Sequence, residues 1–123
     1  MAESFPFMVP GATSSREAMV WAPYDGAEIG TVPMADGAAV DKALETASRL
    51  FKNRDGWLSV EKRIDIMEKT AELMAQRFDM LAVEAAREGG KPLPDSQVEV
   101  ARAIDGVKLC IETLRTQHGS EIP

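Results

Sequence analysis

The clearest signals for the end and start of helices lie in the stretch Glu84-Ala85-Ala86-Arg87-Glu88-Gly89-Gly90-Lys91-Pro92-Leu93-Pro94-Asp95-Ser96-Gln97-Val98-Glu99-Val100-Ala101-Arg102. This stretch predicts the end of one helix, a rigid turn and the start of another helix. The two glycines can adopt the left-handed geometry that closes a helix, and Pro92 and Pro94 prevent that helix from continuing. Asp95 or Ser96 is expected to cap the next helix, with Glu99 in its first turn, where the helix dipole favours negative charge.

A long helix is predicted after this turn. Apolar residues recur there at spacings of four and three, which predicts a helix from about Asp95 to Gln117. The residues of this stripe are Val100, Ile104, Val107, Ile111 and Leu114. At 1.5 Å per residue the helix would be about 35 Å long, which is long for a chain of this size. Such a helix usually spans a whole domain or packs against further protein.

Three more helices are predicted before the turn. The first follows an Asp36 cap and keeps apolar residues at helical spacing from Val40 to Phe51. The second follows a Ser59 cap, and the third runs from about Phe78 to Arg87, either separate from the second or continuous with it. The stripe of the second helix consists of Ile64, Met67, Ala71 and Met74.

The N-terminal part of the chain predicts β structure. Ala18–Trp21 is a strand-like run, Pro23-Tyr24-Asp25-Gly26 has the residues of a turn, and Ile29–Val32 supplies the returning strand. An isolated hairpin is marginal in water, so its apolar face must rest on other structure. Residues 1–16 are interpreted as an extended N-terminal arm. The predicted fold class is therefore mainly α, with an N-terminal β-hairpin and about four helices.

The composition is that of an ordinary soluble globular protein. The chain has 123 residues, of which 45% are hydrophobic and 28% charged, enough for one domain with a core. A net charge of -6 argues against nucleic acid or an anionic membrane as the main partner. No apolar run approaches the roughly 18 residues of a membrane helix. The single cysteine excludes an intrachain disulfide and suits a cytoplasmic location.

The residues themselves reveal no catalytic constellation. Cys110 lies between Leu109 and Ile111 in mid-helix, with no basic neighbour to activate it, so it is interpreted as a small buried hydrophobe. His118 is the only histidine, and a lone histidine makes no metal site. Gly89-Gly90-Lys91 is similar to a phosphate cradle, but no strand precedes it. Composition and spacing predict a helical domain without catalytic apparatus.

Six motifs, in this order, resemble the N-terminal region of the NAD(P)-dependent aldehyde dehydrogenase superfamily. They are the strand-turn-strand segment Val20–Pro33, the Ala-rich helix Val40–Phe51, Trp57 and Ser59 followed by Arg63-Ile64-Asp65-Ile66-Met67, Glu88-Gly89-Gly90-Lys91-Pro92, Glu99-Val100-Ala101-Arg102, and Gly119-Ser120-Glu121-Ile122-Pro123. The resemblance covers nearly everything after the first fifteen residues. The turn and the Glu-Val-x-Arg helix are similar to the lactaldehyde and non-phosphorylating glyceraldehyde-3-phosphate branch.

The resemblance implies that residues 17–123 are the hairpin and helices that flank the coenzyme-binding domain in a larger α/β enzyme. That parent would oxidise a small aldehyde to a carboxylic acid with NAD or NADP. In the family, the cysteine nucleophile, the glutamate base and the nucleotide-binding strands lie beyond this region. The isolated chain is therefore expected to be inactive and to bind no cofactor. Its expected partner is the rest of the parent or a second copy of itself. The alternative is a free-standing, non-catalytic helical interaction module derived from the same scaffold.

The resemblance also implies one candidate cation site. Some family members hold a structural monovalent cation between backbone carbonyls before the Pro-x-x-Gly turn and the acidic residue of the Glu-x-Gly-Lys-Pro signature. Here the ligands would be Val20, Trp21 and Glu88, with at least one further ligand missing. Ligation by oxygen alone suits a hard cation. The simpler interpretation is that Glu88 ends a helix and pairs with Lys91 or Arg87.

Overall fold

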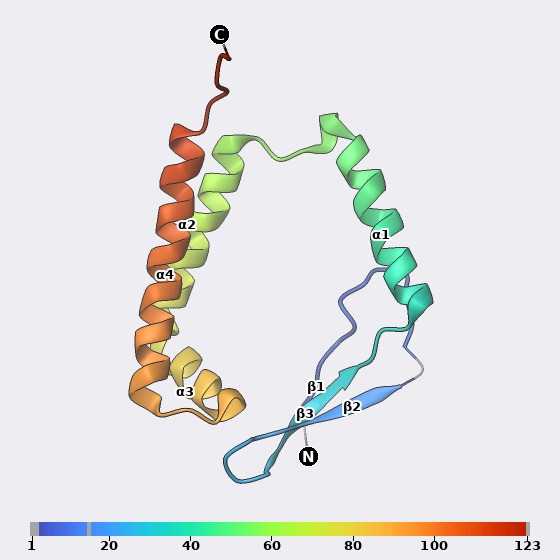
Figure 1. The fold of residues 1–123 in the computed structure, drawn as a ribbon, viewed down its shortest axis with the longest axis vertical. Coiled ribbons are helices and arrows are strands. Elements are labelled where there is room, and N and C mark those ends of the chain that lie inside the picture. Colours follow the sequence, from blue (N-terminus) through green and yellow to red (C-terminus); the bar gives the residue numbers. More distant parts are fainter. Residues whose placement is uncertain (1–2, 15, 123) are drawn as a thin grey trace. The chain divides into compact units, whose positions relative to one another are not determined.

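The computed structural model describes residues 3–14 and 16–122 (Figure 1). Parts of the predicted arm (residues 1, 2 and 15) and the closing Pro123 of the last motif therefore lie outside the described residues. The chain divides into two compact units, each considered by itself below. The first unit comprises residues 1–57 with 88–90, and the second comprises residues 58–87 with 91–123.

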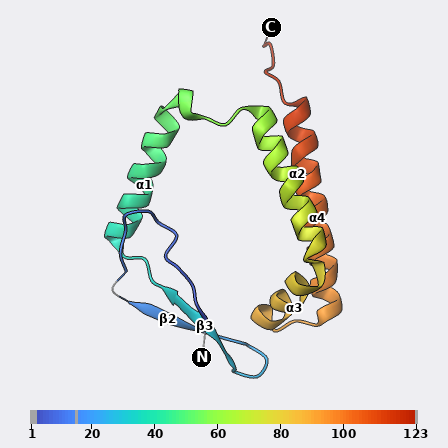
Figure 2. The ribbon, with the colours of Figure 1, turned by 180° about the vertical axis from the view of Figure 1, so that it is seen from behind.

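The predicted hairpin is confirmed in the first unit. Strand β2 (Glu17–Trp21) pairs antiparallel with β3 (Glu28–Pro33), and the two lie side by side in Figure 2. Within the expected arm, the short strand β1 (Glu3–Ser4) pairs parallel with β3, which gives a three-stranded sheet in the order β1-β3-β2. The sequence did not predict this third strand, because two residues carry no detectable period.

Helix α1 (Gly37–Lys52) follows the sheet in the first unit. Its predicted cap is confirmed, because the carboxylate of Asp36 accepts a hydrogen bond of 2.9 Å from the backbone N–H of Ala39. The helix ends at Lys52, with Asn53 as its C-cap, and a short 3-10 turn, η1 (Arg54–Gly56), follows it. Ala39 is buried at 2% exposure, whereas most of the apolar stripe of α1 is exposed.

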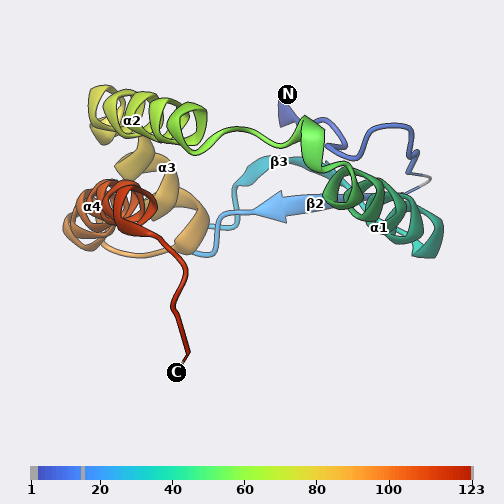
Figure 3. The same ribbon diagram turned by 90° about the horizontal axis from the view of Figure 1, so that it is seen from above.

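Three helices form the second unit. They are α2 (Val60–Gln76), α3 (Phe78–Gly89, whose last two residues belong to the first unit) and α4 (Leu93–Thr116). Helices α2 and α4 pack side by side, as Figure 3 shows from above. The predicted Ser59 cap is confirmed by a 3.1 Å bond from the backbone N–H of Lys62 to the Ser59 hydroxyl. Arg77 ends α2 and separates it from α3.

The core of the second unit lies where the predicted stripes meet. Ala82, Val100 and Ile104 are buried at 0%, 8% and 8% exposure. Three partly buried side chains pack against them: Met74, Phe78 and Leu81. The stripe of α4 therefore faces the other helices of its unit as predicted. Among the described residues, no helix is long and apolar enough to cross a membrane.

The predicted start of α4 was wrong. The helix begins at Leu93 behind Pro92, and neither Asp95 nor Ser96 caps it. The carbonyl of Pro92 already accepts bonds of 3.1 Å and 3.2 Å from the backbone N–H groups of Asp95 and Ser96. Pro94 stands in the first turn, where a missing N–H removes no helical hydrogen bond. Two prolines separated by one residue therefore start this helix early instead of delaying it.

Cys110 was also wrongly predicted to be buried. The structure places it on the exposed surface of α4, next to Leu109, which is 68% exposed. Each residue of a helix is rotated by 100° from the one before it. Cys110 therefore points to one side of the stripe made by Ile104 and Ile111. An apolar neighbour in the sequence is thus a poor guide to burial on a helix.

Ser96 is the fully buried polar side chain of the second unit. It is 0% exposed, and its hydroxyl has no hydrogen-bond partner among the described residues. A hydroxyl that loses water without gaining a partner costs about 1–3 kcal/mol. Replacing Ser96 with a residue of similar size and no polar group should remove that cost.

We therefore expect Ser96→Ala to leave the free energy of unfolding unchanged or to raise it by about 1 kcal/mol. Urea denaturation followed by circular dichroism measures this change. Ser59→Ala is the matched control, since it removes a hydroxyl that caps α2 and should cost about 1 kcal/mol. A comparable loss in Ser96→Ala would instead mean that the Ser96 hydroxyl is hydrogen-bonded in solution.

Candidate functional site

The end of β2 is the first part of the predicted cation site. Val20 lies opposite Gly30, and Trp21 lies opposite Glu28, so the register of the strand pair shifts between these two neighbours. Such an irregularity turns the backbone groups of one strand away from regular pairing. The carbonyls of Val20 and Trp21 therefore belong to a locally distorted strand end rather than to a regular ladder.

The turn after β2 is closed as the sequence predicts. The backbone N–H of Gly26 donates to the carbonyl of Ala22 at 2.9 Å, and the N–H of Ala22 donates to the carbonyl of Ala27 at 2.8 Å. Gly26 has a φ of 71°, in the left-handed region that glycine adopts readily. The carboxylate of Asp25 accepts a further 3.0 Å bond from the N–H of Ala27. These bonds fix the position of Pro23 at the first corner.

The second part of the predicted site is the end of α3. Glu88 lies in its last turn, and Gly90 follows with a φ of 62°. A Cβ atom added at Gly90 would lie 3.0 Å from the Cβ of Pro23 and 3.6 Å from the backbone N of Tyr24. Residues 88–90 thus belong to the same compact unit as the hairpin turn. The left-handed glycine predicted from the sequence is confirmed, and it packs directly against that turn.

The two basic residues of the simpler interpretation each have an acidic neighbour in the structure. The ammonium group of Lys91 bonds the carboxylate of Glu99, and the guanidinium of Arg87 lies 3.5 Å from the carboxylate of Glu84. Within residues 3–14 and 16–122, no group of three or more His, Cys, Asp or Glu side chains could hold a metal ion. Backbone carbonyls would therefore have to supply most ligands of any cation beside Glu88.

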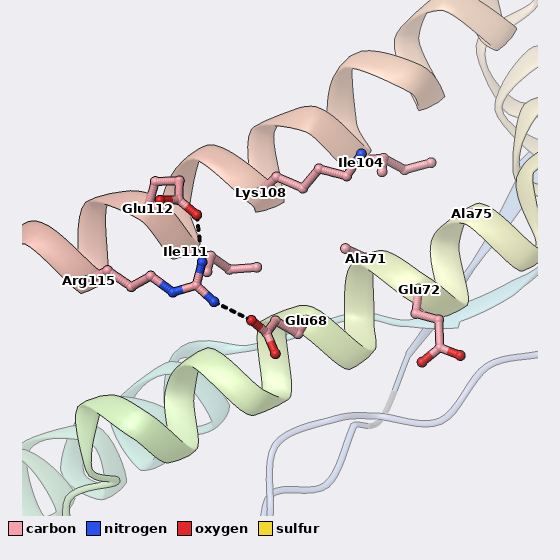
Figure 4. Close-up of a pocket in the computed structure, with 9 residues that line it drawn as sticks. All are labelled: Glu68, Ala71, Glu72, Ala75, Ile104, Lys108, Ile111, Glu112 and Arg115. Atoms are coloured by element: carbon pink, nitrogen blue, oxygen red, sulfur yellow. Dashed lines mark hydrogen bonds and ion pairs between the residues drawn. The ribbon is translucent and has the colours of Figure 1, made fainter.

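A groove between α2 and α4 was not predicted from the sequence (Figure 4). It has a volume of about 440 Å³, with Ile104 and Ile111 from α4 above Ala71 and Ala75 from α2. The remaining lining residues are charged: Glu68, Glu72, Lys108, Glu112 and Arg115. The two alanines, four residues apart on one helix face, were the available signal, because small side chains leave space between helices.

An ion-pair network joins the two helices at one end of this groove. The guanidinium of Arg115 bonds the carboxylate of Glu68 on α2 at 2.5 Å and that of Glu112 on its own helix at 2.7 Å (Figure 4). The side chains of Arg115, Glu68 and Glu112 are 47%, 50% and 64% exposed, so the network contributes little free energy. The lining offers charged groups and aliphatic side chains but no nucleophilic thiol or hydroxyl.

Glu72, at the rim of the groove, has a pKa below its ordinary value of 4.5, because the ammonium of Lys69 hydrogen-bonds and attracts its carboxylate at 2.6 Å. We expect Lys69→Met to raise the pKa of Glu72 toward 4.5. The pKa of Glu72 is lower in the folded chain than in the unfolded chain. The Lys69–Glu72 pair therefore stabilises the fold at pH values above the unfolded pKa, and this stabilisation is lost as the pH falls through the folded pKa. Titration of the carboxyl carbons by NMR measures the change.

Glu45 is the internal control for this titration. Its pKa is also below 4.5, because Lys42 hydrogen-bonds it at 2.9 Å on α1. Lys69→Met leaves that pair intact, so the pKa of Glu45 should not move. An unchanged pKa for Glu72 in the variant would contradict the assigned cause.

Comparison with known proteins identifies the family. The model of the aldehyde dehydrogenase family matches residues 10–123, which is most of the chain. The chain therefore belongs to the aldehyde dehydrogenase family, and the predicted resemblance is confirmed.

Individual relatives agree with this assignment. A putative aldehyde-dehydrogenase-like protein, y4uC, from Sinorhizobium fredii is 33% identical over 114 residues, which are 90% of this chain and 22% of that protein. An N-succinylglutamate 5-semialdehyde dehydrogenase from Burkholderia cenocepacia is 34% identical over 89 residues, which are 71% of this chain and 18% of that protein. The chain thus spans about a fifth of the length of these curated relatives.

Solved structures show the same fold. Aldehyde dehydrogenase 21 from Physcomitrella patens, in complex with the reaction product succinate, matches 100% of this chain and 26% of its own, with a TM-score of 0.85 and 23% identity. The glyceraldehyde-3-phosphate dehydrogenase GapN from Methanocaldococcus jannaschii, complexed with NADP, matches 89% of this chain and 24% of its own. Its TM-score is 0.77 and its identity 28%.

Proposed function

We propose that this chain is the N-terminal part of an NAD(P)-dependent aldehyde dehydrogenase that oxidises a small aldehyde to a carboxylic acid. The observation that carries the proposal is that the matches cover most of this chain but only a small part of each matched protein. The structural match to aldehyde dehydrogenase 21 extends over 100% of this chain but only 26% of that enzyme. A match of this kind is what a segment of the enzyme would give.

In the proposed parent, the hairpin and helices would flank the coenzyme-binding domain, and the nicotinamide cofactor would bind outside this segment. The chain by itself would then neither oxidise aldehydes nor bind NAD or NADP. A cytoplasmic location is proposed with the same function, from the single cysteine and the nature of the chemistry.

The coding sequence after Pro123 tests this proposal most directly. We expect an open reading frame of several hundred further codons, with a cysteine and a glutamate in the catalytic motifs of the family. The extended protein should reduce NAD or NADP in the presence of aldehydes, followed by absorbance, and the 123-residue chain should not. A stop codon directly after Pro123 would overturn the parent-enzyme proposal.

A free-standing interaction module is the second candidate function. Under either function, the exposed apolar side chains of α1, including Leu44 at 62% and Phe51 at 59% exposure, need a covering surface. Such surface on a soluble chain is usually covered by another protein surface. We therefore propose that the 123-residue chain associates with itself as a dimer, whichever of the two functions holds.

We also propose a monovalent cation site formed by the carbonyls of Val20 and Trp21 and the carboxylate of Glu88. The shift in register at the end of β2 and the packing of Gly90 on Pro23 support it. Crystals soaked in a rubidium or caesium salt should show anomalous density beside Glu88, and Glu88→Gln should reduce it. Crystals without such density would leave Glu88 as an ordinary helix-terminal residue.

A further inference from the structure

The exposed stripe of α1 consists of Val40, Leu44, Ala47 and Phe51, at spacings of four, three and four residues. This is the spacing of a seam along which two helices pack. Val40 is 49% exposed, Leu44 62% and Phe51 59%. Ala39, on another side of α1, is only 2% exposed, so the seam lies apart from the buried side of the helix.

Phe51 is held in place at one end of the seam. Its ring lies 5.4 Å from the ring of Trp57, and the guanidinium of Arg54 lies 4.5 Å from its centroid and 4.1 Å from that of Trp57. The indole N–H of Trp57 donates to the carbonyl of Leu50 at 3.2 Å, which ties this cluster back to the helix. A large aromatic side chain is therefore presented in a fixed position and remains more than half exposed.

We propose that this seam pairs with the seam of α1 from a second copy of the chain, with the two helices antiparallel. In that arrangement Val40 lies against the partner's Phe51, and Leu44 lies against the partner's Ala47. Each layer then combines a larger side chain with a smaller one, and the two-fold axis passes between positions 44 and 47. A parallel pair would instead place Phe51 against Phe51 and Ala47 against Ala47, which fills space poorly.

The charges beside the seam select the same orientation. Asp41 directly follows Val40 in the sequence, and Lys52 directly follows Phe51. Each is therefore turned by about 100° from a seam residue in the same direction, and both lie on the same side of the seam. Antiparallel pairing places Asp41 beside the partner's Lys52 at both ends of the interface. In a parallel pair the two copies of this flank would lie on opposite sides of the seam, so Asp41 would lose its contact with the partner's Lys52. Opposed helix dipoles add to this preference.

The interface is small, because one helix of 16 residues forms each side. Stable complexes usually bury about 1,200–2,000 Å², so this dimer should dissociate at micromolar concentrations. The inference names the surface and orientation of the proposed self-association, and it rests on that proposal. It is independent of the family assignment.

Disulfide cross-linking tests the orientation. In a Cys110→Ser background, Val40→Cys and Phe51→Cys chains are purified separately, mixed and oxidised. We expect cross-linked dimers in the mixture and not in either chain alone. Two copies of position 40 would be about 16 Å apart along the axis of an antiparallel pair, well beyond the reach of a disulfide.

Sedimentation measures the association itself. We expect the unmodified 123-residue chain to pass from monomer to dimer across the micromolar range, and Leu44→Glu to remain monomeric at the highest concentration. Leu109→Glu is the matched control, since Leu109 is 68% exposed on α4. It should dimerise normally. Circular dichroism checks that both variants remain folded.

The outcomes separate the two proposals. Dimers that survive Leu44→Glu, or that cross-link through Val40→Cys alone, would overturn the antiparallel α1 interface while self-association stands. A chain that stays monomeric throughout would overturn both, and the assignment to the aldehyde dehydrogenase family would be unaffected.

Discussion

Ile104→Ala is expected to lower the free energy of unfolding of the second unit by about 3 kcal/mol, within the range of about 2–5 kcal/mol for such truncations. Ile104 is 8% exposed and belongs to the core cluster with Ala82 and Val100. Removing three carbons there loses their burial and leaves a cavity that the helices cannot close. Domains are stable by only about 5–15 kcal/mol, so this loss is a large fraction of the total.

Leu109→Ala is the matched control for this truncation. Leu109 stands on the same helix, but it is 68% exposed, so its removal should change stability by less than about 0.5 kcal/mol. Urea denaturation of both variants gives the comparison. Equal losses from Ile104→Ala and Leu109→Ala would contradict the assignment of Ile104 to the core.

The contrast between these two residues also marks what the sequence could predict. A regular stripe identifies the buried face of α4, because burial on a helix repeats with its turn. Two predictions that did not use the stripe failed: Cys110 was judged by its apolar sequence neighbours, and the start of α4 was judged by residue type. The cap was assigned to Asp95 or Ser96 by residue type, whereas Pro92 begins the helix through its backbone. Caps depend on geometry that a short sequence pattern specifies poorly.

In the candidate sites, too, local features could be predicted from the sequence, and contacts between distant segments could not. The left-handed Gly90 and the turn at Gly26 followed from glycine chemistry and are both present. The contact between Gly90 and Pro23 joins segments more than sixty residues apart, and no local pattern predicts such a contact. The groove beside Ala71 likewise depends on which helix packs against α2. Periodicity predicts the elements, and the contacts between them require the fold.

Gly90→Ala is expected to lower the free energy of unfolding by about 2–3 kcal/mol, for two separable reasons. A side chain at a φ of 62° costs about 1–2 kcal/mol in the left-handed region. The new Cβ would also stand 3.0 Å from the Cβ of Pro23, closer than nearly all real contacts of this kind, so the turn must move. Urea denaturation measures the sum of the two effects.

Gly26→Ala separates these two causes. Gly26 has a φ of 71°, but an added Cβ there meets nothing within 4 Å, so Gly26→Ala should lower the free energy of unfolding only by the backbone cost of about 1–2 kcal/mol. The double variant Gly90→Ala with Pro23→Gly should recover the steric part, which a double-mutant cycle measures as coupling. Equal losses at Gly90 and Gly26 without coupling would mean that residues 88–90 do not pack against the hairpin turn in solution. Glu88 would then be too poorly placed to share a cation with the carbonyls of Val20 and Trp21, and the proposed site would fail with the contact that supports it.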